Sequence, residues 1–317
     1  MPIEKIVLLT RKTRLEMLIE RFNTLGQAKF YIERSGADFA DYEREHETYH
    51  ASLQTVREQV EGLAKLHCIE RGFLVNYLFT DKEMVVAVGQ DGLVVNAAKY
   101  LDGQPIVAIN PDPQRFDGVL LPFKPPEAAD AVANVLNNRA RFRPITMAQA
   151  TLSDGQTLLA FNDLFVGRRG HASAFYAIEH GGRREIHSSS GIIVSTGAGS
   201  TGWLSSIYNM ARGLGAPEST GQPENPVSRK VYIPFTWESE MLRFVVREPF
   251  SSRSSQASLV TGDILPRVTL KLESRTPEGG VIFSDGVEND FVNFNSGALA
   301  TIHIAQRKTM LAVKGSS

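Results

Sequence analysis

Short apolar runs alternate with helix-like segments over the first third of the chain. Residues 3–10, 85–88 and 105–110 are apolar enough to form buried strands. Residues 15–22 and 94–101 carry apolar side chains at the spacing of a helix face. This alternation predicts a doubly wound parallel sheet, which binds its ligands at the carboxyl ends of the strands.

Two further segments complete this part of the chain. Residues 72–79 are expected to form another strand, and residues 37–65 a long polar helix. The helix contains His46-Glu47-Thr48-Tyr49-His50, which matches the zinc-protease pattern His-Glu-x-x-His, where two histidines on one helix face bind one metal ion. Its charged flanks favour a solvated helix, because exposed helical histidines are more often solvated than metal-bound. A contact within an oligomer is another use for such a segment.

Beyond residue 122 the pattern changes to short strands and turns. One helix is expected at residues 127–138, after the proline-rich segment 122–126. Gly181-Gly182 separates two strand-like runs, residues 172–179 and 183–188, and predicts a hairpin. Further strands are expected at residues 157–166, 231–235, 242–246 and 268–273.

These patterns predict two domains of different class. We expect an N-terminal α/β nucleotide-binding domain over residues 1–122, to which the apolar tail 305–317 returns. Residues 123–304 are expected to form a C-terminal β-sandwich-like domain.

Composition narrows the possible partners and the compartment. The chain has 317 residues and a net charge of −1, so no global field attracts it to nucleic acid or to an anionic membrane, and neither is expected as a partner. Cys68 is the only cysteine, which excludes an internal disulfide and a cysteine-based zinc cluster and fits a reducing cytoplasm. The first residues lack the pattern of a signal peptide, and no apolar run approaches the length that spans a membrane. We therefore expect a cytoplasmic protein.

The turn Gly89-Gln90-Asp91-Gly92 is the strongest candidate for chemistry. It joins a buried strand to a helix, so its backbone N–H groups and the positive end of the helix dipole favour a phosphate. A carboxylate there would repel a phosphate, so Asp91 is better explained by a metal ion or by a proton that must be removed. The basic turn 11–14 follows the first strand and is either solvated or directed at a phosphate.

Three polar features interrupt the apolar strands of the second part. Asn162-Asp163 places one polar residue on each face of a strand, which indicates either a strand end or bulge, or a ligand site. The glycine- and hydroxyl-rich segment 195–203 ends at Trp203, whose ring could stack on a base or line a pocket, although a plain loop has the same composition. Asp285-Gly286 is most simply a turn between strands.

The order of these features along nearly the whole chain resembles the NAD kinase family. That family has Gly-Gly-Asp-Gly-Thr after a strand, an Asn-Glu or Asn-Asp pair, a Ser-Thr-Gly-rich loop that ends in Ser-Thr-Ala-Tyr, and a late Asp-Gly. The corresponding segments here are 89–93, 162–163, 195–203 and 285–286. Within the family the chain looks most similar to the mitochondrial-type branch, on the evidence of its long N-terminal helical insertion and of segments 110–115, 189–191, 196–200 and 247–249.

This resemblance implies an N-terminal α/β domain and a C-terminal β domain, with a tail that packs back on the first. Members transfer the γ-phosphate of ATP to the adenosine-ribose 2′-hydroxyl of NAD, and some use polyphosphate as the phosphate donor. Mg²⁺ neutralises the triphosphate. By resemblance, Asp91 is the general base or orients that hydroxyl. The residues implied in phosphate or nucleotide binding are Gly89, Gly92 and Asn110, and those implied in NAD binding are Asn162, Asp163, Thr196, Ser200, Thr201 and Trp203. A homodimer or homotetramer is also expected.

Two residues depart from the family signature. Gln90 replaces a glycine, which costs about 1 kcal/mol or more if the position requires a positive φ. Leu93 replaces a threonine and removes a hydroxyl that could cap the helix or contact a phosphate, a loss of about 1 kcal/mol for a cap. Two alternatives therefore stay open: a related kinase that acts on a nucleoside, sugar or lipid hydroxyl, and an NAD-binding regulator without catalytic activity.

Overall fold

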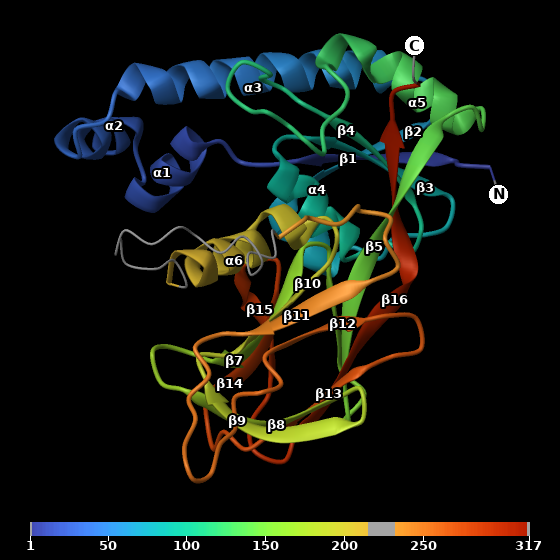
Figure 1. Cartoon of the computed structure of the whole chain (residues 1–317). Coiled ribbons are helices and arrows are strands. Elements are labelled where there is room, and N and C mark those ends of the chain that lie inside the picture. Colours follow the sequence, from blue (N-terminus) through green and yellow to red (C-terminus); the bar gives the residue numbers. More distant parts are fainter. Residues whose placement is uncertain (1, 215–231, 316–317) are drawn as a thin grey trace, which may run out of the picture. The chain divides into compact units, whose positions relative to one another are not determined.

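The computed structural model describes residues 2–214 and 232–315, and the chain divides into two compact units (Figure 1). Unit 1 comprises Met1–Pro144 and Thr309–Ser317, and unit 2 comprises Ile145–Lys308. The strands β5 (Arg141–Leu152) and β16 (Leu299–Val313) contribute residues to both units. Each unit has a hydrophobic core of its own.

A parallel sheet forms the centre of unit 1. Its strands follow the order β2-β1-β3-β4, and the end of β16 pairs with β4 at Met310 and Leu311. Each of these pairings is parallel. The strands are β1 (Lys5–Thr10), β2 (Lys65–Glu70), β3 (Glu83–Val88) and β4 (Pro105–Ile109). Nearly every residue of β3 and β4 is buried, as expected where helices cover both faces of a parallel sheet.

Helices lie on both faces of this sheet. The helices α3 (Phe39–Val60) and α5 (Ala128–Leu136) pack side by side on one face, and α4 (Asp91–Ala98) lies on the other (Figure 1). Val56 of α3 and Val132 of α5 join the same buried cluster as the strand residues. Unit 1 extends past residue 122 to Pro144 because α5 is part of this cluster.

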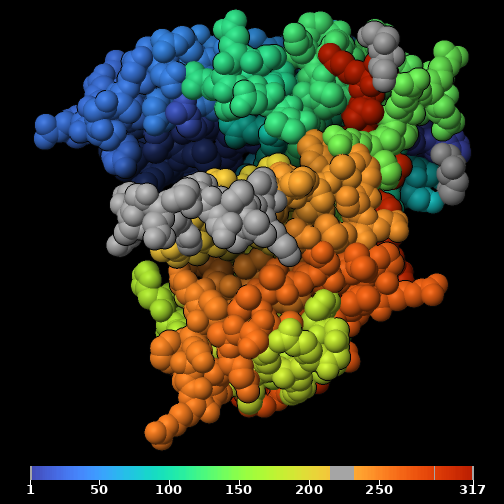
Figure 2. Space-filling view, in the orientation of Figure 1, coloured from blue at the N-terminus to red at the C-terminus, as the bar shows by residue number. Residues whose placement is uncertain are grey.

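Two shorter helices, α1 (Arg14–Phe22) and α2 (Leu25–Arg34), precede α3 and share a small apolar cluster with its first turn. A capping box begins α1: the Thr13 hydroxyl accepts the N–H of Glu16, and the Glu16 carboxylate accepts the N–H of Thr13. The blue surface in Figure 2 shows that this helical segment is exposed on the face drawn there.

One expected strand of unit 1 is wrong. Residues 72–79 do not form a strand; Arg71–Asn76 is a short 3₁₀ helix, and the strand beside β1 is β2, at Lys65–Glu70. The side chain of Glu70 accepts the N–H of Gly72 and so turns the chain at that point. Leu74 is buried while Phe73 and Val75 are each 64% exposed, so the apolar composition of the segment is not used to fill a sheet.

Unit 2 is built from antiparallel strands. One sheet has the strand order β12-β11-β10-β7-β14-β15. Its members are β7 (Asp163–Arg168), β10 (Ile192–Ser195), β11 (Leu242–Val246), β12 (Thr261–Ile264), β14 (Gly280–Ser284) and β15 (Val287–Asn293). Facing strands are β6 (Thr157–Ala160), β8 (Ala174–His180), β9 (Arg183–Ser189) and β13 (Leu270–Ser274), with the unit 2 residues of β5 and β16.

A shared core joins these two layers into a sandwich. Val166 and Ile282 of the first sheet and Ile178 and Leu272 of the second belong to one buried cluster. The helix α6 (Trp203–Leu214) follows β10. The α/β sheet of unit 1 and the antiparallel sandwich of unit 2 confirm the predicted fold class.

Local predictions in unit 2 had mixed outcomes. The hairpin around Gly181-Gly182 is confirmed, and both glycines have positive φ. The expected strand over residues 157–166 is instead two strands, because the chain turns at Phe161 and Asn162. Residues 232–235 form no strand, and Val231 lies outside the described residues. Within the described ranges, no helix combines the length and apolar character that crossing a bilayer requires.

The Tyr49 hydroxyl provides a test of how unit 1 is held together. It accepts the N–H of Arg11 at 2.9 Å and donates to the carbonyl of Val88 at 3.2 Å, and burial raises the pKa of Tyr49 to about 12. We expect Tyr49→Phe to lower the free energy of unfolding by about 1–3 kcal/mol, because two backbone groups lose their partner. Urea denaturation of the purified variant measures this loss.

Tyr42→Phe is the matched control. Tyr42 also lies on α3, its ring is 4.3 Å from the Arg14 guanidinium, and its hydroxyl has no hydrogen-bond partner in the described part of the chain. The free energy of unfolding of Tyr42→Phe should stay within about 0.5 kcal/mol of the parent value. Equal losses in the two variants would contradict the role given to the Tyr49 hydroxyl.

Candidate functional site

The topology of unit 1 marks one place on its sheet for ligand binding. From β1 the chain adds β2 on one side and later β3 on the other, so the strand order reverses between β1 and β3. Open α/β sheets bind ligands outside the carboxyl ends of the strands at such a reversal. Here the carboxyl ends of β1 and β3 lead to Arg11 and Gly89. The basic turn and the Gly89–Gly92 turn, both singled out in the sequence, therefore lie at the expected place.

The Gly89–Gly92 turn is unstrained. Gln90 is the N-cap of α4 with φ −112° and ψ 166°, an extended conformation that any residue adopts. The cost expected for a side chain at this position therefore does not arise. A side chain at Gly89 would disturb the packing instead: a Cβ built there would lie 2.8 Å from Cδ2 of the buried Leu93, which would have to move. Leu93 thus fills the space beneath the turn, and Gln90 makes no side-chain cap to α4.

Asp91 is the first residue of α4 and holds a neighbouring loop. Its Oδ1 accepts the N–H of Leu120 at 2.9 Å, and Oδ2 has no partner among the described residues. Asn110 follows β4, is 4% exposed and anchors the same loop: its Nδ2 donates to the carbonyl of Phe116, and its Oδ1 accepts the N–H of Asp112. The sequence predicted both Asp91 and Asn110 as site residues, and the structure brings both to the loop over residues 111–121.

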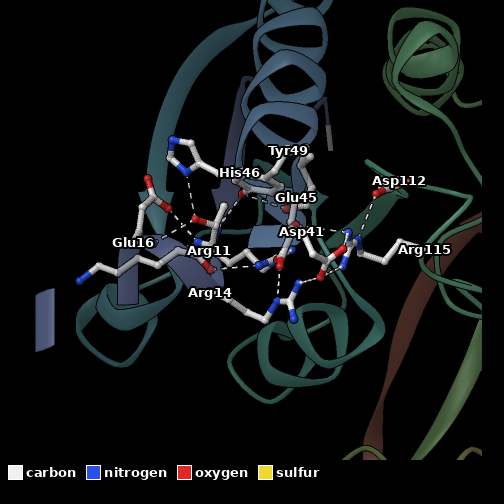
Figure 3. Close-up of polar contacts among 12 residues, drawn as sticks. Arg11, Arg14, Glu16, Asp41, Glu45, His46, Tyr49, Asp112 and Arg115 are labelled. Carbon is white, nitrogen blue, oxygen red and sulfur yellow. Dashed lines mark hydrogen bonds and ion pairs between the residues drawn. The ribbon is translucent and has the colours of Figure 1, made fainter. Parts of the chain in front are cut away.

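Carboxylates neutralise the arginines of the basic turn (Figure 3). Arg11 pairs with Glu45, and Arg14 pairs with both Glu45 and Asp41. Arg115 reaches Asp41 from the loop after β4. These contacts connect the ends of β1 and β4 through two acidic residues of α3.

The ion pair with Glu45 uses the terminal nitrogen Nη2 of Arg11 and leaves its buried Nε without a hydrogen-bond partner among the described residues. The Arg11 side chain is 10% exposed, and its Cδ lies 3.5 Å from where a Cβ on Gly89 would be. Hydrogen bonds from Arg115 and Arg14 hold the pKa of Asp41 well below its usual range, so this carboxylate stays ionised at any physiological pH.

In unit 2, the carboxylate of Asp285 organises the Asn162-Asp163 pair. Asp285 and Gly286 both have positive φ and form the turn between β14 and β15. From that turn, the Asp285 carboxylate accepts the N–H groups of Phe161, Asn162 and Asp163 at 3.1, 2.6 and 3.3 Å. Three donors converging on one carboxylate fix the break between β6 and β7, where the chain passes from one sheet to the other, so Asn162 and Asp163 lie at a strand end.

Asp163 is a buried carboxyl group beside a second carboxylate, that of Asp285. It is 9% exposed, and burial together with the charge of Asp285 raises its pKa to about 7. A carboxyl group in such a position exchanges a proton near neutral pH, and perturbed groups of this kind are concentrated at functional sites.

The hydroxyl-rich loop after β10 uses its own hydroxyls for its fold. Thr196, fully buried, donates to the Phe161 carbonyl at 2.5 Å and accepts the N–H of Gly199. Ser200, also fully buried, donates to the Gly197 carbonyl at 2.7 Å. Thr201 is exposed. Of the hydroxyl residues predicted to bind NAD, Thr196 and Ser200 therefore shape the loop, while Thr201 faces solvent.

Trp203 begins α6 and lines a pocket of about 560 Å³. Its ring stacks on Phe165, with centroids 5.8 Å apart and planes 13° apart, and the Arg247 guanidinium lies 5.3 Å from the Trp203 centroid. The other side chains of this wall include Arg168, Arg169, Phe283, Glu288 and Phe291. Aromatic faces beside guanidinium groups suit a flat, anionic ligand.

Sequence reasoning missed the arginines of this pocket. Arg168-Arg169 at the end of an apolar strand was a visible signal, since charged pairs rarely end a buried strand without a partner. Arg247 belongs to segment 247–249, which the sequence marked only as a likeness to one family branch; its place beside Trp203 comes from the pairing of β10 with β11.

Comparisons with known proteins agree with this architecture. No family model matches the chain. Over 140 residues it is 29% identical to an NAD kinase from Chlorobaculum tepidum; the alignment covers 42% of this chain and 46% of that protein, so the chain spans about half the length of the curated relative it matches. The yeast NADH kinase complexed with NADH superposes with a TM-score of 0.59 at 14% identity, over 99% of this chain and 84% of the other. An NAD kinase from Archaeoglobus fulgidus in complex with ATP superposes with a TM-score of 0.56 at 16% identity. The match covers 97% of this chain and 92% of the other.

The chain has the fold of the NAD kinases. This likeness extends over nearly the whole chain, as the four sequence motifs do.

Gly197 tests the geometry of the loop after β10. A Cβ at this position would lie 1.9 Å from the carbonyl oxygen of Thr236, which is backbone and cannot rotate away. We expect Gly197→Ala to lower the free energy of unfolding by about 3 kcal/mol or more, measured by urea denaturation. Gly213→Ala is the control, because nothing lies within 4 Å of its Cβ and alanine favours α6. A tolerated Gly197→Ala would contradict the loop geometry.

Asp163 gives a prediction about pH. Because its folded pKa of about 7 exceeds the unfolded value near 3.8, the folded state binds the proton more tightly. Its contribution to stability is fully present below about pH 4, falls as the pH rises, and is lost above pH 7. The shift corresponds to at most about 4 kcal/mol.

Asp163→Asn removes this titration. We expect the variant to be more stable than the parent by about 1–3 kcal/mol at pH 8 and equally stable at pH 4. Thermal and urea unfolding across this range measure the difference. A stability difference that does not change with pH would be evidence against the raised pKa.

Proposed function

We propose that this protein is an NAD kinase, which transfers the γ-phosphate of ATP to the adenosine-ribose 2′-hydroxyl of NAD or NADH to give NADP or NADPH. The observation that carries this proposal is Asp91: a carboxylate placed as the first residue of α4, in a phosphate-type turn, on a chain with the NAD kinase fold. The relatives with this fold include one complexed with NADH and one complexed with ATP.

A ribose hydroxyl is a poor nucleophile, and a carboxylate within hydrogen-bond reach removes or orients its proton. Leu120 fixes Asp91 through Oδ1, which leaves Oδ2 to receive the hydroxyl proton. The N–H groups of Asp91 and Gly92 begin α4 and favour phosphate oxygens nearby, whereas the N–H of Leu93 donates to the Gln90 carbonyl. We propose that Gly89, Gly92 and Asn110 shape this phosphate site.

We also propose Mg²⁺ as the ion that binds with ATP. A magnesium ion bound with ATP takes one or two protein carboxylates and completes its shell with phosphate oxygens and water. Because Oδ2 of Asp91 is proposed to receive the hydroxyl proton, we assign no particular residue as a protein ligand of Mg²⁺. When bound, the ion neutralises the triphosphate charge.

We propose that unit 2 supplies the dinucleotide site. Asn162 and Asp163, held by Asp285, offer polar groups at the break between β6 and β7, and the pocket beside Trp203 offers aromatic faces and three arginines. Adenine or nicotinamide rings stack on such faces, and pyrophosphate oxygens pair with guanidinium groups. A cytoplasmic location and a homodimeric or homotetrameric state stay predictions.

The test is an assay of the purified protein with ATP, Mg²⁺ and either NAD or NADH. The parent should form the 2′-phosphorylated product, and Asp91→Asn should lower kcat by about 10²–10⁴-fold while dinucleotide affinity changes little. Asparagine keeps an oxygen for the Leu120 N–H, so the loop stays in place. Asp130→Asn is the matched control, since Asp130 is an exposed acidic residue in the first turn of α5.

The assay also separates the alternatives. Tight NAD binding without phosphoryl transfer from ATP or polyphosphate would indicate a regulator that has no catalytic activity. Absence of binding to NAD and NADH, with clear thermal stabilisation by another nucleoside, sugar or lipid, would indicate a different acceptor. Gln90→Gly should gain no stability, because position 90 does not require a positive φ.

A further inference from the structure

The proposed reaction leaves His46 and His50 without a role. Both lie on α3, four residues apart and therefore on one helix face, and their ring centroids are 4.4 Å apart. Tyr49, between them in sequence, is buried in the core, so this face borders the core. His46 is half-buried and the His50 side chain is 43% exposed, which leaves the pair accessible to small ions.

A third donor comes from a different helix. Glu16 lies in the first turn of α1, and one ligand atom from each of Glu16, His46 and His50 falls within a mutual separation of 4.8 Å. The Glu16 side chain is 32% exposed, and its Oε1 lies 2.9 Å from Nε2 of His50. This convergence requires α1 and α3 to pack together, so it does not follow from the His-x-x-x-His spacing alone.

We propose that Glu16, His46 and His50 form a binding site for a zinc-class divalent transition-metal ion. Two imidazoles and one carboxylate are a donor set that binds Zn²⁺ and leaves a fourth position for water. Ligands about 2.0–2.1 Å from a tetrahedral ion lie about 3.3 Å from one another. The observed separations reach this value through small side-chain rotations, which the partial exposure of these residues permits.

Thr13 positions two of the donors, His46 and Glu16, which lie near one another in Figure 3. The Thr13 hydroxyl lies 3.0 Å from Nδ1 of His46 and so orients that ring, as neighbouring polar groups do for metal-binding histidines. The Thr13 N–H donates to Oε2 of Glu16 at 2.7 Å. The two carboxylate oxygens therefore have separate tasks: Oε2 keeps the cap of α1, and Oε1 faces His50 and can bind the ion.

Binding would fasten α1 to α3 beside the basic turn. Thr13 stands between Arg11 and Arg14, whose guanidinium groups pair with Glu45 of α3. The ion would thus add a link between the two helices that already hold the turn at the end of β1. The rival explanation is a hydrogen bond between Glu16 and His50 that needs no metal ion.

Zinc titration of the chelator-treated full-length protein tests the proposal. The experiment uses a Cys68→Ser background, because Cys68 is exposed and adjoins His67, and a thiol next to an imidazole binds zinc on its own. Competition with a chromophoric chelator should show one saturable Zn²⁺ per chain, and Co²⁺ should give the visible spectrum of a tetrahedral site. Zinc should also raise the melting temperature by several degrees.

Single changes assign the ligands. Glu16→Gln, His46→Gln and His50→Gln should each weaken Zn²⁺ binding by at least about tenfold and remove the thermal shift, as loss of a ligand does. His67→Gln is the matched control, an exposed histidine of the same unit, and should bind like the parent. Circular dichroism of the metal-free variants checks their fold, and Glu16→Gln can keep its bond to Thr13 through its amide oxygen.

The results that would overturn the proposal are specific. These are no saturable binding in the Cys68→Ser parent, unchanged affinity in all three ligand variants, or loss of binding in His67→Gln alone. Any of them would leave the Glu16–His50 contact as a plain hydrogen bond. Because metal binding is measured without nucleotides, failure here is distinguishable from failure of the proposed kinase activity.

Discussion

Unit 1 depends on a single buried hydroxyl at the point where its strand order reverses. Tyr49 reaches from α3 to the N–H after β1 and to the carbonyl that ends β3, so one side chain fixes both strand ends. Strand ends at such a reversal have backbone groups that no neighbouring strand satisfies, and burying them without a partner would cost about 1–3 kcal/mol each. The bridge keeps Arg11 against Gly89 and thereby sets the shape of the candidate phosphate site.

Asp285 has the corresponding role in unit 2, by the opposite chemistry. There a carboxylate accepts three successive N–H groups and fixes the break between β6 and β7. The turn that carries it needs positive φ at two successive residues, which Asp285 and Gly286 provide. In each unit the candidate site is thus placed by a polar side chain that completes backbone hydrogen bonding, while apolar packing supplies the rigid sheet beneath it.

The sequence predicted what local chemistry determines and missed what long-range packing determines. The β3–turn–α4 segment and the hairpin at Gly181-Gly182 were readable, because an apolar run that stops at a glycine turn has few other structures. The strand expected at residues 72–79 was wrong, since at the edge of a sheet apolar composition does not distinguish a strand from an exposed turn. The bond from Asp285 to Asn162 spans more than a hundred residues, and Glu16 lies some thirty residues before the histidines it faces. No periodic pattern of residues in the sequence predicts either of these contacts.

The structure also changes which departure from the family signature carries weight. A side chain at position 90 would strain the backbone only at a positive φ, and Gln90 has φ −112°. Leu93 is buried against Gly89, where a threonine would bring a hydroxyl into an apolar contact that lacks a partner. Gln90 is therefore accepted without backbone strain, and Leu93 fills the apolar space beneath the turn. Asp163 contrasts with them, because a carboxyl group buried beside Asp285 destabilises the folded protein at neutral pH. A buried residue that opposes stability is best explained by ligand chemistry. We therefore propose the dinucleotide contact at Asp163 rather than at the hydroxyls of Thr196 and Ser200, which donate to backbone carbonyls.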